Sequence, residues 1–524
     1  MVNDPLSANS GFLLARRILT LVPGLSGDAL WWHAGRIRAV GRATDLEPKV
    51  PSRVPRFDLR GCLVTPGFTD GHTHFASWAV GRNRVHLAGA GTRAEALEMV
   101  ARGPVFRGWV MGHGWDANSW SESPERWSLD RVQTLPVYLD SLDVHAAWVN
   151  SAALLIAGIT RDTPDPYGGR IVRDGNGDPT GLLLERAVEL MTPHFPQPSP
   201  EDLLAAVREA QTEAHRLGVT GIHNVEGPDA LAAFRALETE NGLRLRVLFH
   251  PPVQKLPDLV RMKATSGSGT DWLRLGGVKM FLDGSLGSRT AWMLEPYEDG
   301  RDRGMPITAE EVAREAMTTA AQAGLACTVH AIGDAAVRRA LDLMSDLQPA
   351  AIPHRIEHFQ CVNPADLNRA AAAGIVVSMQ PAHLLVDIPL ADRQWGARSR
   401  GAYAFKSLLQ RGTVVAFGSD VPVATLDPRQ GVYAAMERRM LDGAPMPGWY
   451  PEERLSFEEV VSAYTQANAR AGGVVDRRGT LGVGMDADLV AWQADPALDR
   501  GDGEAFLNGR AALTVVGGEV MMQA

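Results

Sequence analysis

The residues with the clearest chemistry lie in the segment PGFTDGHTHF, residues 66–75, which contains His72 and His74. On an extended strand, side chains two positions apart point to the same face. Neutral imidazole is the commonest protein ligand for zinc-like metals, and two ordinary loop histidines are the alternative. Asp70 falls on the same face and is expected to orient a ligand. An apolar strand at residues 63–64 is expected to lead into this metal site.

Further ligand types follow other apolar segments. Lys279 lies in the apolar segment GGVKMFLDG, where a free ammonium group is costly and cannot bind a metal because it has no lone pair. The alternative is a lysine that snorkels from the strand end to solvent or forms an ion pair with Asp283 or Asp420. The histidines, the lysine and the aspartate that follow the apolar segments can together hold two divalent ions. The set of candidate metal ligands is His72, His74, Lys279, His330, His358 and Asp420.

The elements that must position them follow a regular rhythm from residue 199 onward. Ser199 caps a predicted helix with Pro200 at its first position, and Gly218 closes it before an apolar strand. Residues 308–311 form a second predicted helix start, a capping box. Alternating helices and apolar strands with polar tips predict a (β/α)8 TIM barrel. Its predicted strands are LVTPGF, GVTGIH, RLRVLFH, LGGVKMFLDG, CTVHAIGD, HRIEHFQ, IVVSMQP and VVAFGSD.

The segments before and after the predicted barrel, and an insertion within it, are expected to form structure of their own. Residues 1–65 and 471–524 contain short predicted strands, and we expect the two segments to complete one sheet. The barrel is expected over residues 66–470, with an insertion at about 76–205. Within the insertion, the sequence GGRIVRDGNGDPTG predicts two strands around a tight turn.

Composition limits the function classes. The chain has 524 residues, 45% hydrophobic and 22% charged, as in an ordinary globular protein. Its net charge of −9 argues against a nucleic-acid or anionic-membrane partner. No apolar run has the length of a membrane span, and we expect no signal peptide. The scattered cysteines, Cys62, Cys327 and Cys361, fit reduced thiols in a cytoplasmic protein.

The segments PGFTDGHTHF, GGVKMFLDGSLGSRTA, VHAIGDAAV, RIEHFQ and GSDVPVATLDP together resemble the amidohydrolase superfamily. The likeness is to its amidohydrolase-3 branch, which includes N-substituted formamide deformylases. The resemblance implies that His72, His74 and Asp420 bind a first metal and that His330 and His358 bind a second. It also implies that Lys279 is carboxylated and bridges the two ions, and that the two terminal segments form a small composite β-sandwich.

The expected function is that of a metal-dependent hydrolase cleaving a C–N bond of an N-acyl, N-formyl or cyclic amide. A bound divalent ion, expected to be zinc at one or two per chain, lowers the pKa of water from ~15.7 towards ~7. Asp420 is the expected general base and then acid. The same centre acting on an ester or phosphoester is the alternative. A non-catalytic binding protein would be favoured by missing ligands, and none is missing.

Candidates for substrate contact are weaker, because loop-bracing hydrogen bonds or packing explain them about as well. Those in the aromatic-rich insertion are Trp115 and His145, and those on loops after predicted strands are Ser285, Arg289, Gln380 and His383. The expected partner is a small-molecule substrate, with a homodimer as the assembly considered.

Overall fold

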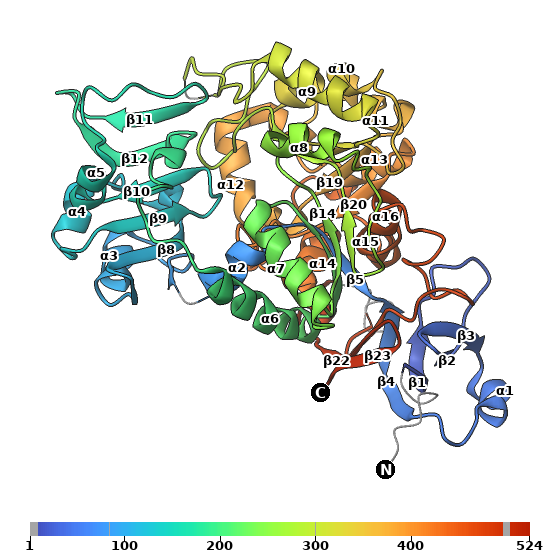
Figure 1. The fold of residues 1–524 in the computed structure, drawn as a ribbon. Coiled ribbons are helices and arrows are strands. Elements are labelled where there is room, and N and C mark those ends of the chain that lie inside the picture. The colour runs from blue at the N-terminus through green and yellow to red at the C-terminus, as the bar shows by residue number, and fades with distance from the viewer. Residues whose placement is uncertain (1–8, 83, 299, 496–502) are drawn as a thin grey trace.

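The computed structural model describes residues 9–82, 84–298, 300–495 and 503–524. It is an α/β protein with three regions. Figure 1 shows a central group of strands and helices, the teal insertion on one side of it, and a sheet formed by blue and red segments on the other.

The central strands form two sheets in which all neighbours are parallel. The first has the order β15-β14-β13-β5 and the second the order β16-β17-β18-β19-β20. Isolated parallel bridges, Pro252 to Lys279 and Thr73 to Val421, link the two sheets. The strands are β5 (Phe68–Thr73), β13 (Val219–Asn224), β14 (Arg246–Phe249), β15 (Leu273–Leu275), β16 (Val278–Phe281), β17 (Cys327–Ala331), β18 (Arg355–His358), β19 (Val376–Met379) and β20 (Val415–Phe417).

The predicted first strand needs a correction. Residues 63–66 belong to β4 (Arg56–Pro66), which pairs with β1 and β21 in the terminal sheet. The strand beside β13 is β5, so Asp70 and His72 lie within a strand and His74 follows directly after it. Apolar character alone predicts a buried strand here but not which sheet it joins.

Helices lie between the central strands. Ser199 caps α6 as predicted, with Pro200 at the first position, and Asp202 completes a capping box with it. The capping box predicted at residues 308–311 does not form: the N-cap of α9 is Ala309, one residue later than predicted, and it has no side-chain cap hydrogen bond. The longer helices are α6 (Pro200–Arg216), α7 (Pro228–Thr239), α9 (Glu310–Gln322), α10 (Asp334–Met344), α12 (Leu384–Trp395), α14 (Pro428–Glu437) and α15 (Phe457–Tyr464).

The shorter helices complete this layer or cover the outer regions. They are α1 (Ala43–Leu46), α2 (Phe75–Gly81), α8 (Leu256–Arg261), α11 (Arg369–Ala372), α13 (Phe405–Gln410), α16 (Gln466–Ala471) and α17 (Gly503–Leu507). None of the helices in the described ranges is long and apolar enough to cross a membrane.

The two ends of the chain share one sheet, of order β23-β22-β21-β4-β1-β2-β3, as the sequence predicts. Here β4 pairs in parallel with β1 and antiparallel with β21, so an N-terminal strand lies inside a partly C-terminal sheet. The remaining strands are β1 (Gly11–Ile18), β2 (Ala29–His33), β3 (Arg36–Gly41), β21 (Leu489–Trp492), β22 (Ala511–Val516) and β23 (Glu519–Gln523).

The insertion has its own sheet, of order β11-β12-β10-β9-β8-β6, with β7 beside β8. The predicted hairpin is confirmed, since β11 and β12 pair antiparallel around residues 174–178. The strands are β6 (Val85–His86), β7 (Val105–Phe106), β8 (Trp109–Trp115), β9 (Val137–Ser141), β10 (Ala146–Val149), β11 (Gly169–Arg173) and β12 (Pro179–Glu185). The helices are α3 (Arg93–Ala101), α4 (Arg126–Asp130) and α5 (Ser151–Ala157).

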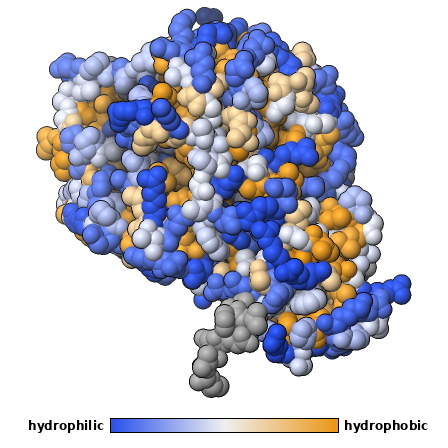
Figure 2. Space-filling view, turned by 45° about the vertical axis from the view of Figure 1, so that its right-hand side comes forward, coloured by the Kyte–Doolittle hydropathy of each residue, from blue (hydrophilic) through white to orange (hydrophobic). Residues whose placement is uncertain are grey.

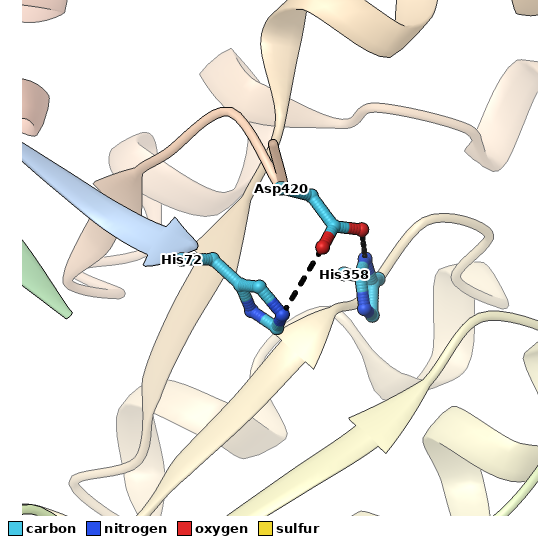
Figure 3. Close-up of side chains that lie close together, drawn as sticks. All are labelled: His72, His358 and Asp420. Carbon is cyan, nitrogen blue, oxygen red and sulfur yellow. Dashed lines mark ion pairs between the residues drawn. The ribbon is translucent and has the colours of Figure 1, made fainter. Parts of the chain in front are cut away.

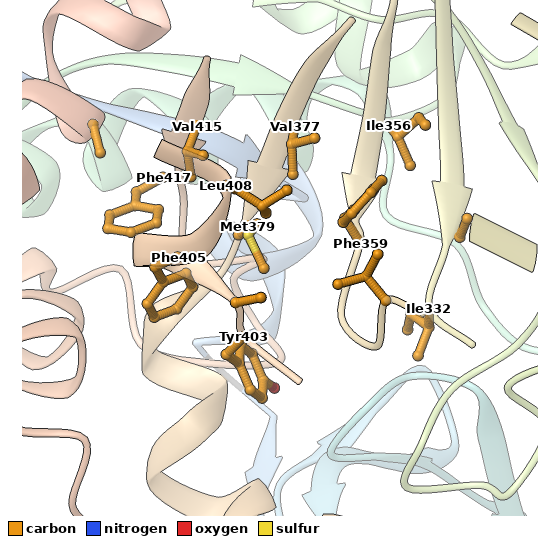
Figure 4. Packing of buried hydrophobic residues seen from close by; sticks show 14 of the residues in the cluster. Ile332, Ile356, Phe359, Val377, Met379, Tyr403, Phe405, Leu408, Val415 and Phe417 are labelled. Atoms are coloured by element: carbon orange, nitrogen blue, oxygen red, sulfur yellow. The ribbon is translucent and has the colours of Figure 1, made fainter. Parts of the chain in front are cut away.

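A buried apolar core holds the central strands, whose carboxyl ends carry the polar residues. Figure 4 shows Ile356, Val377 and Met379 from adjacent strands packing beside Val415 and Phe417. Full burial of each such side chain contributes about 1.5–3 kcal/mol. In Figure 2 the visible face intersperses hydrophilic with hydrophobic residues. The strands whose ends carry the polar side chains are therefore anchored by a buried apolar layer.

Candidate functional site

Three predicted ligands meet where β5, β18 and β20 end (Figure 3). Ligand atoms of His72, His358 and Asp420 all lie within 4.8 Å of one another, and all three residues are buried. The Oδ1 atom of Asp420 is 3.4 Å from Nε2 of His72, and its Oδ2 atom is 4.0 Å from Nδ1 of His358. This is a His/His/carboxylate group of the kind that holds divalent ions.

The other predicted ligands surround this group. Nε2 of His74 is 3.3 Å from Oδ1 of Asp420. The His330 ring lies 4.5 Å from the His358 ring between centroids, and its Nε2 bonds with the carbonyl of Gly284 at 3.0 Å. Nζ of Lys279 lies 4.7 Å from the centre of the Phe281 ring. Five of the predicted ligands therefore lie close together at one end of the central strands. Lys279 lies within β16, and its charge contributes to the lowered pKa of His72, which indicates that it lies nearby.

Buried atoms that lack a hydrogen-bond partner show whether these residues suit a metal. At the metal group, three buried ligand atoms have no hydrogen-bond partner in the described chain: Nε2 of His72, Nδ1 of His358 and Oδ1 of Asp420. Buried polar atoms are normally paired, because each unpaired one costs about 1–3 kcal/mol. Their convergence on one point fits a bound cation.

Protonation of the group also fits. Burial, aided by Lys279, lowers the pKa of His72 to about 4, and burial lowers the pKa of His358 well below its ordinary value. Burial alone would raise the pKa of Asp420, but the nearby histidines outweigh it and hold that pKa well below its ordinary value. Neutral imidazoles and an ionised carboxylate are the forms that bind metals.

Lys279 is the unusual member of the group. Its side chain is buried, and burial lowers its pKa to about 8, although the Glu357 and Asp420 carboxylates oppose this shift. The alternative ion pair with Asp283 does not form, because that carboxylate accepts the backbone N–H groups of Trp292, Ile332 and Gly333 instead. Lys279 is therefore a buried amine with no hydrogen bond to any described residue.

Sequence reasoning missed a residue beneath the metal group, Glu357. Its Oε2 atom is 2.5 Å from Nδ1 of His72, and Arg355 holds the same carboxylate through its guanidinium. Both Glu357 and Arg355 are almost fully buried. Such a carboxylate fixes the ring orientation of a ligating histidine. The sequence signal that could have identified Glu357 is its place next to His358 in RIEH. Adjacent residues of a strand are expected to point to opposite faces, however, so this signal does not predict that both side chains reach one site.

The backbone explains this exception. His358 and Asp420 both have positive φ angles, 70° and 61°, which are uncommon for residues other than glycine. Asp70, expected to orient a ligand, accepts the backbone N–H groups of His72 and Ser419 instead, at 3.1 and 2.8 Å. It joins the ends of β5 and β20 and so holds two ligand-bearing segments together.

The predicted substrate contacts fall into different surroundings. Trp115 packs in the insertion's interior against Trp120 and Trp148, and its indole N–H donates to the carbonyl of Leu139, which favours a structural role. The His383 ring lies 6.5 Å from that of His358, and its Nε2 is 3.1 Å from the carbonyl of Ser419.

Gln380 is buried, with Nε2 donating to the carbonyl of Ser378 at 3.4 Å. The Arg289 guanidinium lies over the Tyr297 ring at 5.3 Å. Ser285 donates to Asp143, and His145 lies 5.3 Å from His330 between ring centroids. Ser285 and His145 thus connect the insertion with the metal group.

Comparison of the sequence with known proteins finds a matching family and several similar proteins. The profile described as "Amidohydrolase family" matches residues 56–522. The protein LONG AFTER FAR-RED 3 of Arabidopsis thaliana is 32% identical over 487 residues, which cover 88% of this chain and 83% of that protein. N-substituted formamide deformylase of Arthrobacter pascens is 27% identical over 501 residues, 90% of each chain.

The solved structures similar to this chain include a metal-dependent hydrolase. An uncharacterized metal-dependent hydrolase from Pyrococcus furiosus superposes with a TM-score of 0.73 at 29% identity, covering 93% of this chain and 99% of that one. The matched region therefore includes the metal group, the insertion and most of the terminal sheet.

Proposed function

Because this chain belongs to the amidohydrolase family, we propose that it is a metal-dependent hydrolase that cleaves the C–N bond of an amide. The substrate class is an N-acyl, N-formyl or cyclic amide. The observation that carries the proposal is the convergence of buried, unpaired ligand atoms from His72, His358 and Asp420 on one point. N-substituted formamide deformylase, a relative over 90% of the chain, supports the choice of an amide.

The metal would be held by His72, His358 and Asp420, with His74, His330 and Lys279 around them. Zinc, at one or two ions per chain, is the expected metal. When bound, a divalent ion supplies Lewis-acid polarisation of a carbonyl and lowers the pKa of water from ~15.7 towards ~7.

Asp420 is the residue proposed to move the proton. Its carboxylate is ionised because its pKa lies well below the ordinary value, as a base requires. It lies between His72 and His358, so one oxygen can accept a proton from the attacking water. The same oxygen then returns that proton to the departing nitrogen of the amide.

Lys279 is proposed to carry a carbamate. The lowered pKa leaves a fraction of the amine neutral near pH 7, and only a neutral amine can attack CO2. Carbamate formation turns an amine that cannot bind a metal in its charged form into an anionic oxygen donor. Burial next to Asp420, without a hydrogen-bond partner, supports this assignment.

The architecture that supports this chemistry is proposed to be a (β/α)8 TIM barrel over residues 66–470, with an insertion at about 76–205. The parallel strands and the two bridges between their sheets support it. The ligands then lie at the carboxyl ends of barrel strands, where such barrels place chemistry. Residues 1–65 and 471–524 are proposed to form the composite β-sandwich. Cytoplasmic location and a homodimer remain predictions from sequence.

The test is a panel of N-formyl amines, N-acetyl amines and cyclic amides, each matched by an ester with the same acyl group. Metal analysis of the purified protein accompanies it. We expect one to two equivalents of divalent metal, loss of hydrolysis with chelator, and higher kcat/KM for amides than for matched esters. A metal-free protein whose activity survives chelation would contradict the proposal, and faster ester or phosphotriester cleavage would favour the alternative substrate class.

A further inference from the structure

Arg355 is a buried arginine that lies beneath the metal group. It is the first residue of β18, and it is 1% exposed. Alternation along the strand places Arg355 and Glu357 on the same face, and the guanidinium donates from Nε and Nη2 to the two carboxylate oxygens. Nη2 also lies 2.8 Å from Oγ of Ser378, a residue of β19. These partners all belong to the sheet that runs from β16 to β20.

Other contacts of the same guanidinium reach the second group of central strands. Nη2 donates to the carbonyl of Gly71 at 2.6 Å, and Nη1 lies 2.8 Å from Nδ1 of His223. Gly71 belongs to β5 and His223 belongs to β13, which pair in the sheet of order β15-β14-β13-β5. One buried side chain therefore links strands of both central sheets.

Two of the residues that Arg355 holds are direct neighbours of predicted metal ligands. Gly71 precedes His72 in β5, and Glu357 precedes His358 in β18. Glu357 also contacts the other ligand, since its Oε2 atom is 2.5 Å from Nδ1 of His72. Arg355 therefore reaches His72 by two routes, through the backbone carbonyl before it and through the carboxylate that orients its ring.

The backbone at Gly71 is also restrained by close packing. A Cβ atom at this position would lie 2.7 Å from the carbonyl oxygen of Phe417 on β20 and 2.5 Å from Oδ1 of Asn468. Strands β5 and β20 therefore approach each other more closely here than a side chain at residue 71 would allow. Packing against β20 and the hydrogen bond to Arg355 restrain the same residue, directly before His72.

Stability alone does not account for an arginine at this position. Moving a guanidinium and a carboxylate out of water is costly, and well-packed apolar side chains of similar volume often serve a buried site equally well. What a guanidinium adds is a rigid planar fork of donors, which holds several acceptors in one fixed arrangement. At Arg355 those acceptors lie on β5, β13, β18 and β19.

We propose that Arg355 is a positioning residue that fixes where His72 lies relative to His358 and thereby sets the affinity of the metal group for a divalent ion. The inference rests on the proposed metal binding, and it does not depend on which bond the protein cleaves. Ligands that are locked in place before an ion arrives bind it more tightly than mobile ligands do. Residues outside the ligand set that orient the ligands contribute strongly to metal affinity.

The experiment compares Arg355→Lys with Arg438→Lys. Arg438 is also fully buried, but its guanidinium donates to the carbonyls of Trp449 and Tyr403. Lysine keeps the charge and loses the planar fork. Zn²⁺ affinity is measured by competition with a chromogenic chelator, at a temperature where thermal unfolding shows each protein to be folded. We expect Arg355→Lys to bind Zn²⁺ about 10–100-fold more weakly. Arg438→Lys should have a lower thermal midpoint and an unchanged Zn²⁺ affinity.

The visible absorption spectrum of each protein loaded with Co²⁺ separates positioning from a general loss of stability, because its bands report the arrangement of the ligands. The bands should shift in Arg355→Lys and stay unchanged in Arg438→Lys. Ser378→Ala, which removes one acceptor of Nη2, should weaken Zn²⁺ affinity roughly 2–10-fold, the equivalent of one hydrogen bond. This milder variant decides the question by itself if Arg355→Lys does not fold.

The outcomes distinguish this inference from the proposed function. Unchanged Zn²⁺ affinity and an unchanged Co²⁺ spectrum in the folded variants of Arg355 and Ser378 would overturn the inference. An unmodified protein that binds neither ion would contradict the proposed metal site and this inference with it. An unmodified protein that binds Zn²⁺ but hydrolyses no amide would contradict only the proposed substrate class.

Discussion

The metal group and the contact between the central strands and the terminal sheet both bury charged side chains, but they do so in opposite ways. At the terminal sheet, Arg246 makes two hydrogen bonds to Asp488, at 3.1 and 3.2 Å, and Arg478 pairs with Asp486 at 2.8 Å. At the metal group, Lys279 and one oxygen of Asp420 have no hydrogen-bond partner in the described chain.

The difference separates structural from chemical roles. Paired buried charges offset each other's desolvation and leave nothing for a ligand. Unpaired buried groups cost stability, so their convergence requires a bound partner or a catalytic use.

Asp420→Asn keeps size and one oxygen but removes the base. We expect a loss of roughly 10²–10⁴-fold in kcat, the scale of general acid–base catalysis, while much of the metal is retained. Steady-state kinetics and elemental analysis of the same preparation check this. If the variant keeps its rate, another group carries the proton, and His383, whose ring lies 6.5 Å from that of His358, is the next candidate.

Lys279→Ala should remove most activity and lower metal content, with a loss of roughly 10²-fold or more if a carbamate contributes ligand oxygens, a scale set by the effects of altering a metal site. Small carboxylic acids such as acetate should partly restore both, because a carboxylate can replace the missing anion. Lys406→Ala, which removes a lysine paired with Glu459 instead, is the matched control. Normal metal content and rate in Lys279→Ala would show that the amine is structural.

Glu357→Gln should weaken metal binding by about 10–100-fold, because the carboxylate that orients His72 loses its charge. Competition with a chromogenic chelator measures this without substrate. The change also leaves the buried Arg355 guanidinium without its anionic partner, so the metal-free protein should lose about 3–5 kcal/mol of stability, and metal affinity is therefore measured at a temperature where both proteins are folded. Equal affinities in variant and unmodified protein would reduce Glu357 to a packing role.

Asp488→Asn should affect stability and leave kcat unchanged. Burial alone would raise the pKa of Asp488, but Arg246 and Arg478 outweigh it and hold the pKa below its ordinary value of 3.8. A depressed folded-state pKa contributes stability that is present above about pH 4 and lost as pH falls through the folded value. The variant should lose about 2 kcal/mol at pH 7, and the difference should shrink below pH 4.

Thermal unfolding between pH 7 and pH 3 tests this last expectation. A difference in midpoint that stays constant over that range would mean that the Asp488 charge contributes nothing. A fall in kcat would mean that the terminal sheet is coupled to the metal group.

Sequence alone predicts the family and proposes the residues of the metal group, but it does not indicate the ion pairs at the terminal sheet. The resemblance to the amidohydrolase family is confirmed. His72, His358 and Asp420 are predicted from their positions after apolar strands, and the structure brings them within 4.8 Å. These three side chains converge because parallel strands present their carboxyl ends at one edge of a sheet, and their role as metal ligands stays a prediction.

What sequence could not predict depends on backbone conformation and pairing. Glu357 and His358 are neighbours that both contribute to the metal group, because the positive φ of His358 interrupts strand alternation. Residues 63–66 belong to the terminal sheet, which local apolarity cannot indicate. Asp283 accepts backbone N–H groups from Trp292, in the loop after β16, and from Ile332, just after β17, and it does not pair with Lys279.

The pairing of β4 with β21 has a consequence for how the protein is made. Pro66 lies opposite Leu489 in that pairing, so the ribosome must add the intervening residues before the two strands can meet. At about 5–20 residues per second, this takes roughly 20–85 s. During that time one edge of β4 has no partner strand, and the nascent chain must be protected from association with its neighbours until its last strands emerge.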